Sequence, residues 1–422
     1  MENVVRLNGS QGRVERLIAQ VQAHLDTVIL PYWSSKVVRA DGNGFYGLIT
    51  ATEIADPDAP MGSILMSRIL WTFATVAQDR PTNHRYAALA RLAFNQLKRL
   101  HIDPVHGGVY WSSSPDGSPL ESHKHSYAQA FAIYGLTAYY NLTREPEALR
   151  LALHTFQLLE RHAHDVTHGG YLEARVRDWS PRSDGRLSER DAASPKSTNT
   201  NLHILEAYTA LLKTTANAEV AFALEQLLGI FTTRIVRPNG HCDTFFSRSW
   251  TPEHSHVSYG HDIEAMWLML DAAEALECHG STPSHLCTVT QLIPIMAEAT
   301  RREGMGQDGG IHYEVTHEGV LDTDKHWWPQ AEAAVGFIVA FLETGREDYL
   351  TAAEAVWHYI ETHLVDPIHG EWYARLDDNH RRYPNEAKVD QWKCPYHNAR
   401  ACLEIEKRLT RALIHQETST NA

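Results

Sequence analysis

Apolar residues recur at intervals of three and four along most of the chain. The first such run covers residues 14–28 and the second covers residues 64–73. This spacing gathers apolar side chains on one face of an α-helix. Ten later segments show the same helical pattern, so the chain is predicted to form twelve helices. The later segments are roughly 84–100, 124–142, 145–162, 197–214, 216–235, 260–277, 286–301, 327–343, 347–364 and 395–412.

A glycine-aromatic turn recurs six times between these segments. Its marker glycines are Gly44, Gly107, Gly169, Gly240, Gly309 and Gly370, which are 63, 62, 71, 69 and 61 residues apart. A step of this size holds two helices and their connections. Glycine followed by aromatic and β-branched residues indicates a short extended hairpin at each turn.

Six helical hairpins can form an open solenoid or a closed ring. Solenoid repeats are usually shorter and end in distinct caps, whereas these turns are long, differ in content and carry histidines and tryptophans. The pattern favours an all-α (α/α)6 barrel with short β-hairpin loops and a site at one end. Because no linker interrupts the repeats, residues 1–422 are expected to form one domain with frayed ends at 1–10 and 414–422.

The composition narrows the range of partners. The net charge of −14 disfavours nucleic acid and anionic membranes. The chain contains no run of eighteen apolar residues and does not begin like a secretory signal. Its five cysteines form neither a CxxC pair nor a metal-ligand spacing, which fits a reducing compartment. We therefore expect a cytoplasmic protein, monomeric or weakly dimeric.

The segment from Ser258 to Glu264 places polar residues where a buried helix should be apolar. His261 and Glu264 are three positions apart, so they share a helix face. The carboxylate is expected to hold the imidazole in one tautomer and to raise its basicity. The alternative is a histidine that is simply hydrogen-bonded in the core.

A second polar segment runs from Trp392 to Arg400. Pro395 suits the first position of a helix, which would put His397 in the first turn. There the positive end of the helix dipole lowers the pKa of His397 and favours the neutral base. Tryptophan, tyrosine, histidine and arginine within about one turn suit a core poorly, so a functional role is favoured.

Two further segments carry candidate residues. Asn199, His203 and Glu206 share one helix face. The adjacent Trp327 and Trp328 indicate a stacking platform for a sugar ring, although packing in the core explains them equally well.

Isolated polar and aromatic positions add two candidates. Arg68 is a cation on an otherwise apolar helix, and its alternative role is a buried salt bridge. Tyr127, Phe131 and Tyr134 form an aromatic ladder that fits core packing more readily than a site.

The 26 histidines raise the question of a metal. The chain has no HExxH motif, and His261 with Glu264 would supply only two of the three protein ligands that a zinc site needs. His123 and His125 flank Lys124, which weakens them as a ligand pair. No metal is therefore expected. The absence of a glycine-rich phosphate loop and of a GxSxG elbow disfavours nucleotide and serine-hydrolase chemistry.

These segments resemble the cellobiose 2-epimerase branch of the N-acylglucosamine 2-epimerase family. The similarity extends over most of the chain, and WKCPYHNAR and SYGHDIE are specific to this branch. Met61 departs from the branch, where a lysine is common. The matching stretches are GFYG at 44–47, RILWTF at 68–73, YAQAFAIY at 127–134, NTNLHILEAYT at 199–209, SYGHDIEA at 258–265, WWPQAE at 327–332 and WKCPYHNAR at 392–400.

The resemblance implies an (α/α)6 barrel and a cofactor-free isomerase that inverts C2 of a reducing-end aldose. It implies that His261 and His397 form the acid/base pair, supported by the catalytic residues His203, Arg68 and Glu264. It also implies substrate stacking on Trp392 and on Trp327 or Trp328. The further expected substrate-binding residues are Asn199, Tyr127 and Glu332.

Several alternatives remain open from the sequence. The substrate is expected to be a β-1,4-disaccharide (cellobiose, lactose or mannobiose), or else free D-mannose and D-glucose, with a ketose as a possible side product. The loops 173–198 and 240–258 would decide this. An inverting glycosidase would need two carboxylates about 6.5–9.5 Å apart, and Asp262, Glu332 and Asp390 are available. A non-catalytic helical scaffold or sugar-binding module is a third hypothesis.

Overall fold

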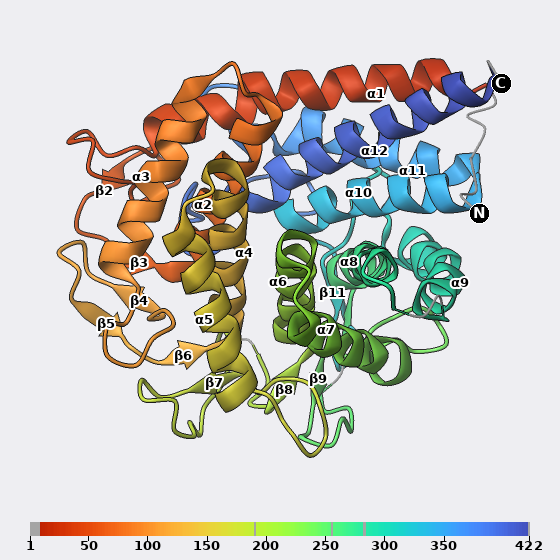
Figure 1. Ribbon diagram of the computed structural model, residues 1–422. Helices are drawn as coiled ribbons and strands as arrows, with labels where there is room; N and C mark the ends of the chain where they lie inside the picture. Colours follow the sequence, from red (N-terminus) through yellow and green to blue (C-terminus); the bar gives the residue numbers. More distant parts are fainter. Residues whose placement is uncertain (1–8, 190, 255, 282–283, 421–422) are drawn as a thin grey trace.

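The computed structural model describes residues 9–189, 191–254, 256–281 and 284–420 (Figure 1). Within these ranges it contains twelve α-helices, which confirms the predicted number. They are α1 (Gln11–His24), α2 (Ser63–Asp79), α3 (His84–Leu100), α4 (Ser126–Thr143), α5 (Pro146–His162), α6 (Thr198–Thr215), α7 (Ala218–Ile230), α8 (Tyr259–Cys278), α9 (Ser284–Ala299), α10 (Trp327–Thr344), α11 (Glu347–Tyr359) and α12 (Tyr396–Thr420).

Short π-helical turns continue several helices at their carboxyl ends. Four of them follow the outer helices α1, α7, α9 and α11 directly, and this explains why the sequence pattern of α7 and α11 extends beyond the α-helix itself. The π-helical turns are η1 (Leu25–Ile29), η2 (Tyr32–Lys36), η3 (Phe231–Ile235), η4 (Thr300–Gly304) and η5 (Ile360–Leu364).

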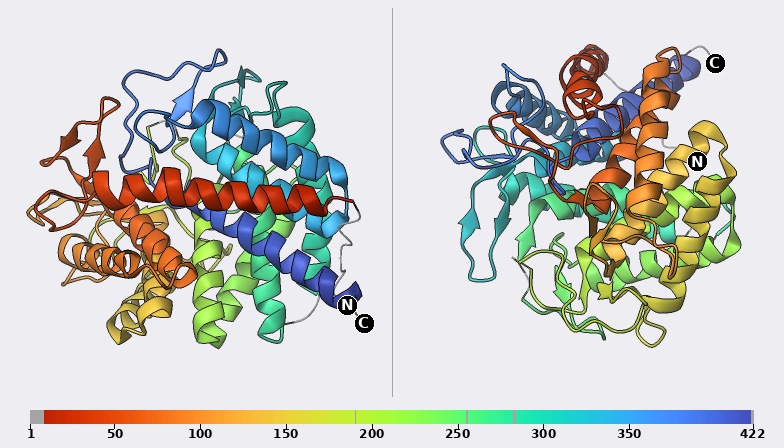
Figure 2. Two further views of the ribbon diagram at one scale, coloured as in Figure 1. Left: turned by 90° about the horizontal axis from the view of Figure 1, so that it is seen from above. Right: turned by 90° about the vertical axis from the view of Figure 1, so that its left-hand side faces the viewer.

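The helices form two concentric rings. The inner helices α2, α4, α6, α8, α10 and α12 contact one another in that order, and α12 also contacts α2. Each outer helix from α3 to α11 packs on the inner helix that precedes it, while α1 packs on α12. Figure 2 shows these first and last helices side by side. The ring is therefore closed, as expected for an (α/α)6 barrel, and not an open solenoid.

Short antiparallel strands lie next to the amino-terminal ends of the inner helices. The pairs are β1 with β2, β6 with β7, β8 with β9 and β13 with β14, and the three-stranded sheets are β3-β4-β5 and β10-β11-β12. Several of these pairs, such as β3 with β4 and β6 with β7, join segments that two helices separate. The predicted hairpins at the six glycine turns are confirmed by single antiparallel bridges such as Ile102 with Val109. The strands are β1 (Leu48–Ile49), β2 (Ala55–Asp56), β3 (Met61–Gly62), β4 (Ser112–Ser113), β5 (Pro119–Glu121), β6 (Lys124–His125), β7 (Ala174–Arg175), β8 (Lys196–Ser197), β9 (Phe245–Phe246), β10 (Val257–Ser258), β11 (Glu314–Val315), β12 (Leu321–Asp322), β13 (Lys325–His326) and β14 (Arg375–Leu376).

The fourth residue of an inner helix fastens the turn that precedes that helix. In four helices its side chain accepts a backbone N–H from the turn at 2.6 to 2.9 Å. The pairs are Gln129 with Val109, Asn201 with Tyr171, Asp262 with Cys242 and Gln330 with Ile311. All six marker glycines have a positive φ, which disfavours residues with a side chain. A Cβ on Gly240 or Gly309 would also lie 2.7 or 3.0 Å from a backbone carbonyl of the neighbouring outer helix.

Buried ion pairs add a second fastening. Lys124 on β6 binds Asp103 of the preceding turn at 2.9 Å, and both side chains are fully buried. Lys196 binds Asp165 in the same way at 3.1 Å. Lys124, which lies between His123 and His125 in the sequence, therefore has a structural role. Met61 occupies the equivalent position on β3, where the sequence departs from the expected lysine.

The chain ends differ in part from the expectation of frayed segments. Residues 1–8 and 421–422 of those segments lie outside the described residues, whereas α12 continues as a helix to Thr420. Within this last stretch the Thr418 hydroxyl donates to the Ile414 carbonyl one turn earlier. In the described part of the chain, no helix combines the length and apolarity needed to cross a membrane.

His101 follows α3 and generates a prediction about acid stability. It is completely buried, and neither ring nitrogen has a hydrogen-bond partner among the described residues. Burial, together with the charge of Arg99, lowers the pKa of His101 to about 3. Below its ordinary pKa of about 6.5 the unfolded chain binds a proton that the folded chain does not, so stability decreases as pH falls from 6.5 towards 3.

We expect His101→Leu to remove this contribution. Between pH 7 and pH 5 the free energy of unfolding of the variant should decrease by about 2 kcal/mol less than that of the wild type. Urea unfolding at the two pH values measures the difference. The same pH dependence in both proteins would contradict the prediction.

Candidate active site

The amino-terminal turns of the inner helices converge on one cavity of about 880 Å³. All six inner helices or the residues just before them contribute side chains to it. The predicted site residues that line the cavity are Arg68, Tyr127, Asn199, His203, His261, Glu264, Trp327, Trp328, Trp392 and His397. Residues that are far apart in sequence therefore meet because each lies in the first turns of an inner helix or just before it.

His397 is the second residue of α12, directly after Pro395 and Tyr396, as the sequence pattern predicts. Its Nδ1 lies 2.6 Å from Oε1 of Glu332. A carboxylate only accepts hydrogen bonds, so this contact favours a proton on Nδ1 and leaves the Nε2 lone pair as the base. Burial and the charges of Arg68 and Arg400 lower the pKa of His397, which keeps the ring neutral.

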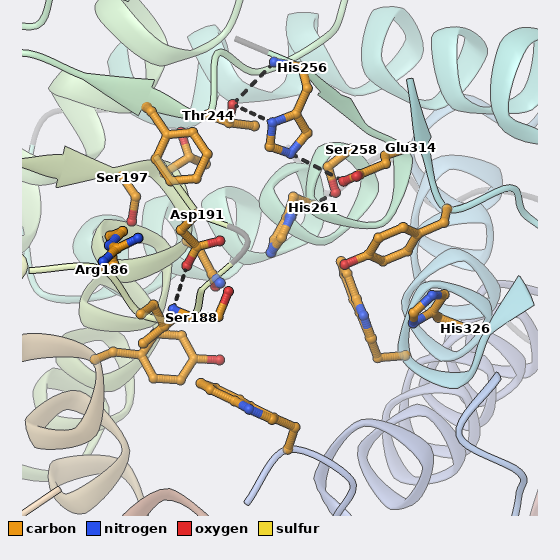
Figure 3. A pocket seen from close by; sticks show the side chains of 18 of the residues that line it. Arg186, Ser188, Asp191, Ser197, Thr244, His256, Ser258, His261, Glu314 and His326 are labelled. Atoms are coloured by element: carbon orange, nitrogen blue, oxygen red, sulfur yellow. Dashed lines mark hydrogen bonds and ion pairs between the residues drawn. The ribbon is translucent and has the colours of Figure 1, made fainter. Parts of the chain in front are cut away.

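His261 is held by a different partner from the one that the sequence suggested. Its Nδ1 lies 2.7 Å from the Ser258 hydroxyl, and Figure 3 shows the two side chains beside the cavity. Burial, with the neighbouring His203 and His256, lowers the pKa of His261 to about 3. The expectation that Glu264 holds His261 is wrong, because Glu264 binds Arg400 at 2.6 Å instead.

Arg400 lies in the centre of a buried ionic network. Its guanidinium binds Glu206 and also binds Glu264 and Glu332, each of the latter two at 2.6 Å. The three carboxylates come from α6, α8 and α10, and Arg400 itself is only 1% exposed. The three carboxylates can therefore be buried, because the guanidinium of Arg400 neutralises part of their charge.

The carboxylates of this network differ in their pKa values. Burial raises the pKa of Glu264, and the nearby charge of Glu332 raises it further. Burial likewise raises the pKa of Glu332. For Glu206, Arg400 and the hydrogen bond with His203 outweigh burial and lower the pKa to about 2. The predicted contact between His203 and Glu206 is present, at 3.0 Å.

Arg68 has no carboxylate partner among its described contacts, so a buried salt bridge does not explain it. It donates to the Tyr127 hydroxyl at 2.8 Å and lies over the ring of Phe131, 4.1 Å from its centroid. The aromatic ladder therefore has two roles, because Phe131 packs while Tyr127 also lines the cavity. An unpaired guanidinium that lines a cavity is suited to an anionic or strongly polar ligand.

Trp328 of α10 lies close to both histidines. The ring centroid of Trp328 is 4.6 Å from that of His261 and 5.8 Å from that of His397. Trp392 approaches Tyr127 with ring centroids 6.1 Å apart. The cavity therefore combines flat apolar faces with polar groups, an arrangement typical of a sugar-binding site.

Comparison with known proteins agrees with this geometry. The sequence model of the family described as N-acylglucosamine 2-epimerase (GlcNAc 2-epimerase) matches residues 44–401. The chain belongs to this family.

Individual relatives support the same assignment. A cellobiose 2-epimerase from Bacteroides fragilis is 40% identical over 395 residues, which cover 93% of this chain and 99% of the relative. The solved structure of a cellobiose 2-epimerase from Spirochaeta thermophila has a TM-score of 0.88 and 38% identity, covering 96% of this chain and 99% of that one. A D-mannose isomerase from Marinomonas mediterranea is 24% identical, covering 92% and 97%. The chain is therefore an isomerase of the sugar 2-epimerase type.

The mouth of the epimerase cavity contains residues that the helical pattern did not single out. Figure 3 shows Ser188 and Asp191 on one side and Thr244 and His256 on the other. They belong to the loops 173–198 and 240–258, which were expected to shape the substrate site. The sequence pointed to these loops by their position but not to individual residues in them, because the loop residues follow no helical or strand period.

A third side of the mouth was not anticipated at all. Glu314 belongs to β11, and the tip of the β11–β12 hairpin lines the cavity with it. His256 lies 3.4 Å from Glu314 and bonds Thr244 at 3.2 Å, which connects the hairpin to the second loop. Glu173 also lines the cavity, and burial raises its pKa to about 8.

The carboxylates proposed for a glycosidase do not face one another across the epimerase cavity. Asp262 binds His241 at 2.7 Å and is not among the lining residues. Glu332 is not among the lining residues; it bonds His397 and accepts a hydrogen bond from Trp267 at 3.1 Å. Of the three candidates in the described part of the chain, only Asp390 lines the cavity.

Glu264, Glu332 and His397 form the one group in the described residues with the spacing of a metal site. A protein cation already bridges its two carboxylates, because Nη2 of Arg400 lies 2.6 Å from each. We therefore expect a chelator such as EDTA to leave the rate of sugar conversion unchanged. Loss of the rate on chelation, restored by a divalent ion, would contradict this.

Proposed function

We propose that this epimerase inverts C2 of the reducing-end aldose of a β-1,4-disaccharide such as cellobiose, lactose or mannobiose. The observation that carries the proposal is the pair of histidines on different helices, His261 and His397. Each is anchored through Nδ1, and both lie beside the ring of Trp328. Two anchored imidazoles around one stacking surface are suited to proton transfer at the two faces of a sugar carbon.

The chemistry begins with opening of the sugar ring, which exposes the C1 aldehyde. The C2 hydrogen then becomes acidic, because its electron pair delocalises into a cis-enediolate. One histidine removes the proton from one face, and the other returns a proton to the opposite face. Each such transfer is typically worth about 10²–10⁴ in rate. The direction in which each histidine acts depends on which epimer is bound.

The charge that develops on the sugar needs compensation. Arg68 lines the cavity and is free of carboxylate partners among its described contacts, so it is suited to stabilise the oxygen of the enediolate. The amino-terminal ends of the inner helices point towards the same space, and the positive ends of their dipoles favour an anion there. His203 packs against Tyr127, with ring centroids 4.9 Å apart, and completes this wall.

The extent of the cavity favours a disaccharide over a monosaccharide. Besides the histidines, polar residues such as Asp191 and Glu314 from the connecting segments line it. Its volume of about 880 Å³ leaves room for a second sugar next to a reducing-end sugar beside Trp328. The high identity to proteins named cellobiose 2-epimerase supports the same choice.

A second candidate is conversion of free D-mannose and D-glucose, or of an aldose to a ketose. The distant relationship to a D-mannose isomerase favours it. The chemistry is related, because loss of the O2 proton from the enediolate in place of inversion yields the ketose.

Proton NMR in D₂O tests these proposals. The protein is incubated with cellobiose and, separately, with D-mannose. We expect new anomeric signals of the C2 epimer and entry of deuterium at C2, with cellobiose reacting faster. Faster conversion of D-mannose would overturn the disaccharide assignment, and release of glucose without exchange at C2 would favour a hydrolase.

The same assay tests the two histidines. We expect His261→Ala and His397→Ala each to reduce epimerisation at least about 100-fold, because each removes one proton transfer, while the melting temperature stays close to that of the wild type. The control is His101→Leu, which removes a buried histidine outside the cavity and should keep wild-type activity. More than a tenth of the activity in either alanine variant would refute the two-histidine mechanism.

A further inference from the structure

Ser258 occupies the N-cap position of α8 but does not cap the helix with its side chain. At the equivalent position of α6, the Ser197 hydroxyl accepts the backbone N–H of Thr200 at 3.1 Å, as an N-cap serine usually does. The Ser258 hydroxyl instead lies 2.7 Å from Nδ1 of His261 and is nearly inaccessible to solvent. The Ser258 hydroxyl therefore contacts an imidazole in place of the backbone N–H that an N-cap serine usually binds.

The partners of the two histidines are chemically different. His397 faces a carboxylate of Glu332, whereas His261 faces a neutral hydroxyl. No carboxylate of the described residues hydrogen-bonds to His261, since Arg400 holds Glu264 away from it. A hydroxyl accepts from an N–H whether the imidazole is neutral or protonated.

The groups around His261 make this acceptor more important. Burial lowers the pKa of His261, and the neighbouring His203 and His256 lower it further. These effects oppose the imidazolium form. Among the described residues, the Ser258 oxygen is the one hydrogen-bond partner of Nδ1 of His261. It is therefore the group that stabilises the Nδ1–H of the imidazolium.

We propose that Ser258 is a positioning residue for proton transfer by His261: its hydroxyl accepts the Nδ1–H of the ring and so keeps Nε2 directed at C2 of the sugar in both protonation states. This inference rests on the proposed epimerase function. It adds a residue that the two-histidine mechanism does not contain.

The proton balance shows where the hydroxyl acts. When His397 removes the C2 proton, it becomes an imidazolium and the electron pair enters the enediolate. His261, which enters this step as the imidazolium, gives its Nε2 proton to C2 at the opposite face and becomes neutral with its Nδ1–H still on Ser258. In the reverse direction the neutral His261 takes the C2 proton at Nε2. The pair holds one extra proton before and after each conversion.

Without the hydroxyl, His261 fails in both roles. The imidazolium loses its acceptor, and the neutral ring is free to carry its proton on Nε2, where it can no longer act as a base. His397 is unaffected, because its partner is Glu332. The two epimers should therefore respond differently, since one is deprotonated by His397 and the other by His261.

The test is Ser258→Ala, with each purified C2 epimer incubated in D₂O and followed by NMR. For one epimer we expect inversion to fall at least about tenfold while deuterium still enters C2 of the unreacted sugar, so the ratio of exchange to inversion rises. For the other epimer, exchange and inversion should fall together. Misplacement of a reacting group costs rate in this way.

Two matched variants separate this role from folding. Ser258→Thr keeps the hydroxyl and should restore the wild-type ratio. Ser258→Gly removes the hydroxyl but leaves a residue that is well tolerated at an N-cap, and it should reproduce the asymmetry even if the alanine variant folds poorly. A proportional loss of exchange and inversion from both epimers would overturn the proposal. Wild-type protein without exchange or inversion would instead refute the epimerase function itself.

Discussion

The guanidinium of Arg400 is the interaction on which the centre of the barrel depends. It comes from α12 and binds carboxylates of α6, α8 and α10, so four of the six inner helices meet at one cation. Each buried carboxylate is costly to remove from water, and removing the cation would leave all three uncompensated. Elsewhere these helices pack through apolar side chains. At Arg400, ion pairs fix their positions relative to one another.

The same network determines how the histidines of the site are held. Glu332 binds both Arg400 and His397, and Glu206 binds both Arg400 and His203. The buried ionic network is therefore connected to two of the histidines that line the cavity. Glu264 is the exception, because its bond to Arg400 leaves His261 to the hydroxyl of Ser258. The two candidate proton-transfer groups consequently have unequal environments, although the proposed inversion at C2 requires them to perform equivalent steps.

In each repeat, different residues stabilise the turn and line the cavity. Buried clamps such as Gln129 and buried pairs such as Lys124 with Asp103 fasten each turn to the ring. The helix ends that they hold present histidine, arginine and tryptophan to the cavity. The loops that line the cavity vary in length and sequence from one repeat to the next, so they can change without disturbing the helix ends that carry His261 and His397.

The sequence alone determined the number of helices, the six repeats and ten of the side chains that line the cavity. These features follow from local rules: an apolar period of 3.6 residues, glycine where the backbone adopts a positive φ, and polar residues at helix starts. The contact of His203 with Glu206 was also predictable, because residues three apart share a helix face.

Only the tertiary structure decided which partner each polar group takes. Glu264 is three residues from His261 but binds Arg400, which is 136 residues away. Glu332 lies behind His397 and not in the cavity, and the β11–β12 hairpin closes one side of the mouth. A buried carboxylate binds the strongest cation within reach, and that choice depends on how whole helices pack rather than on spacing along one of them.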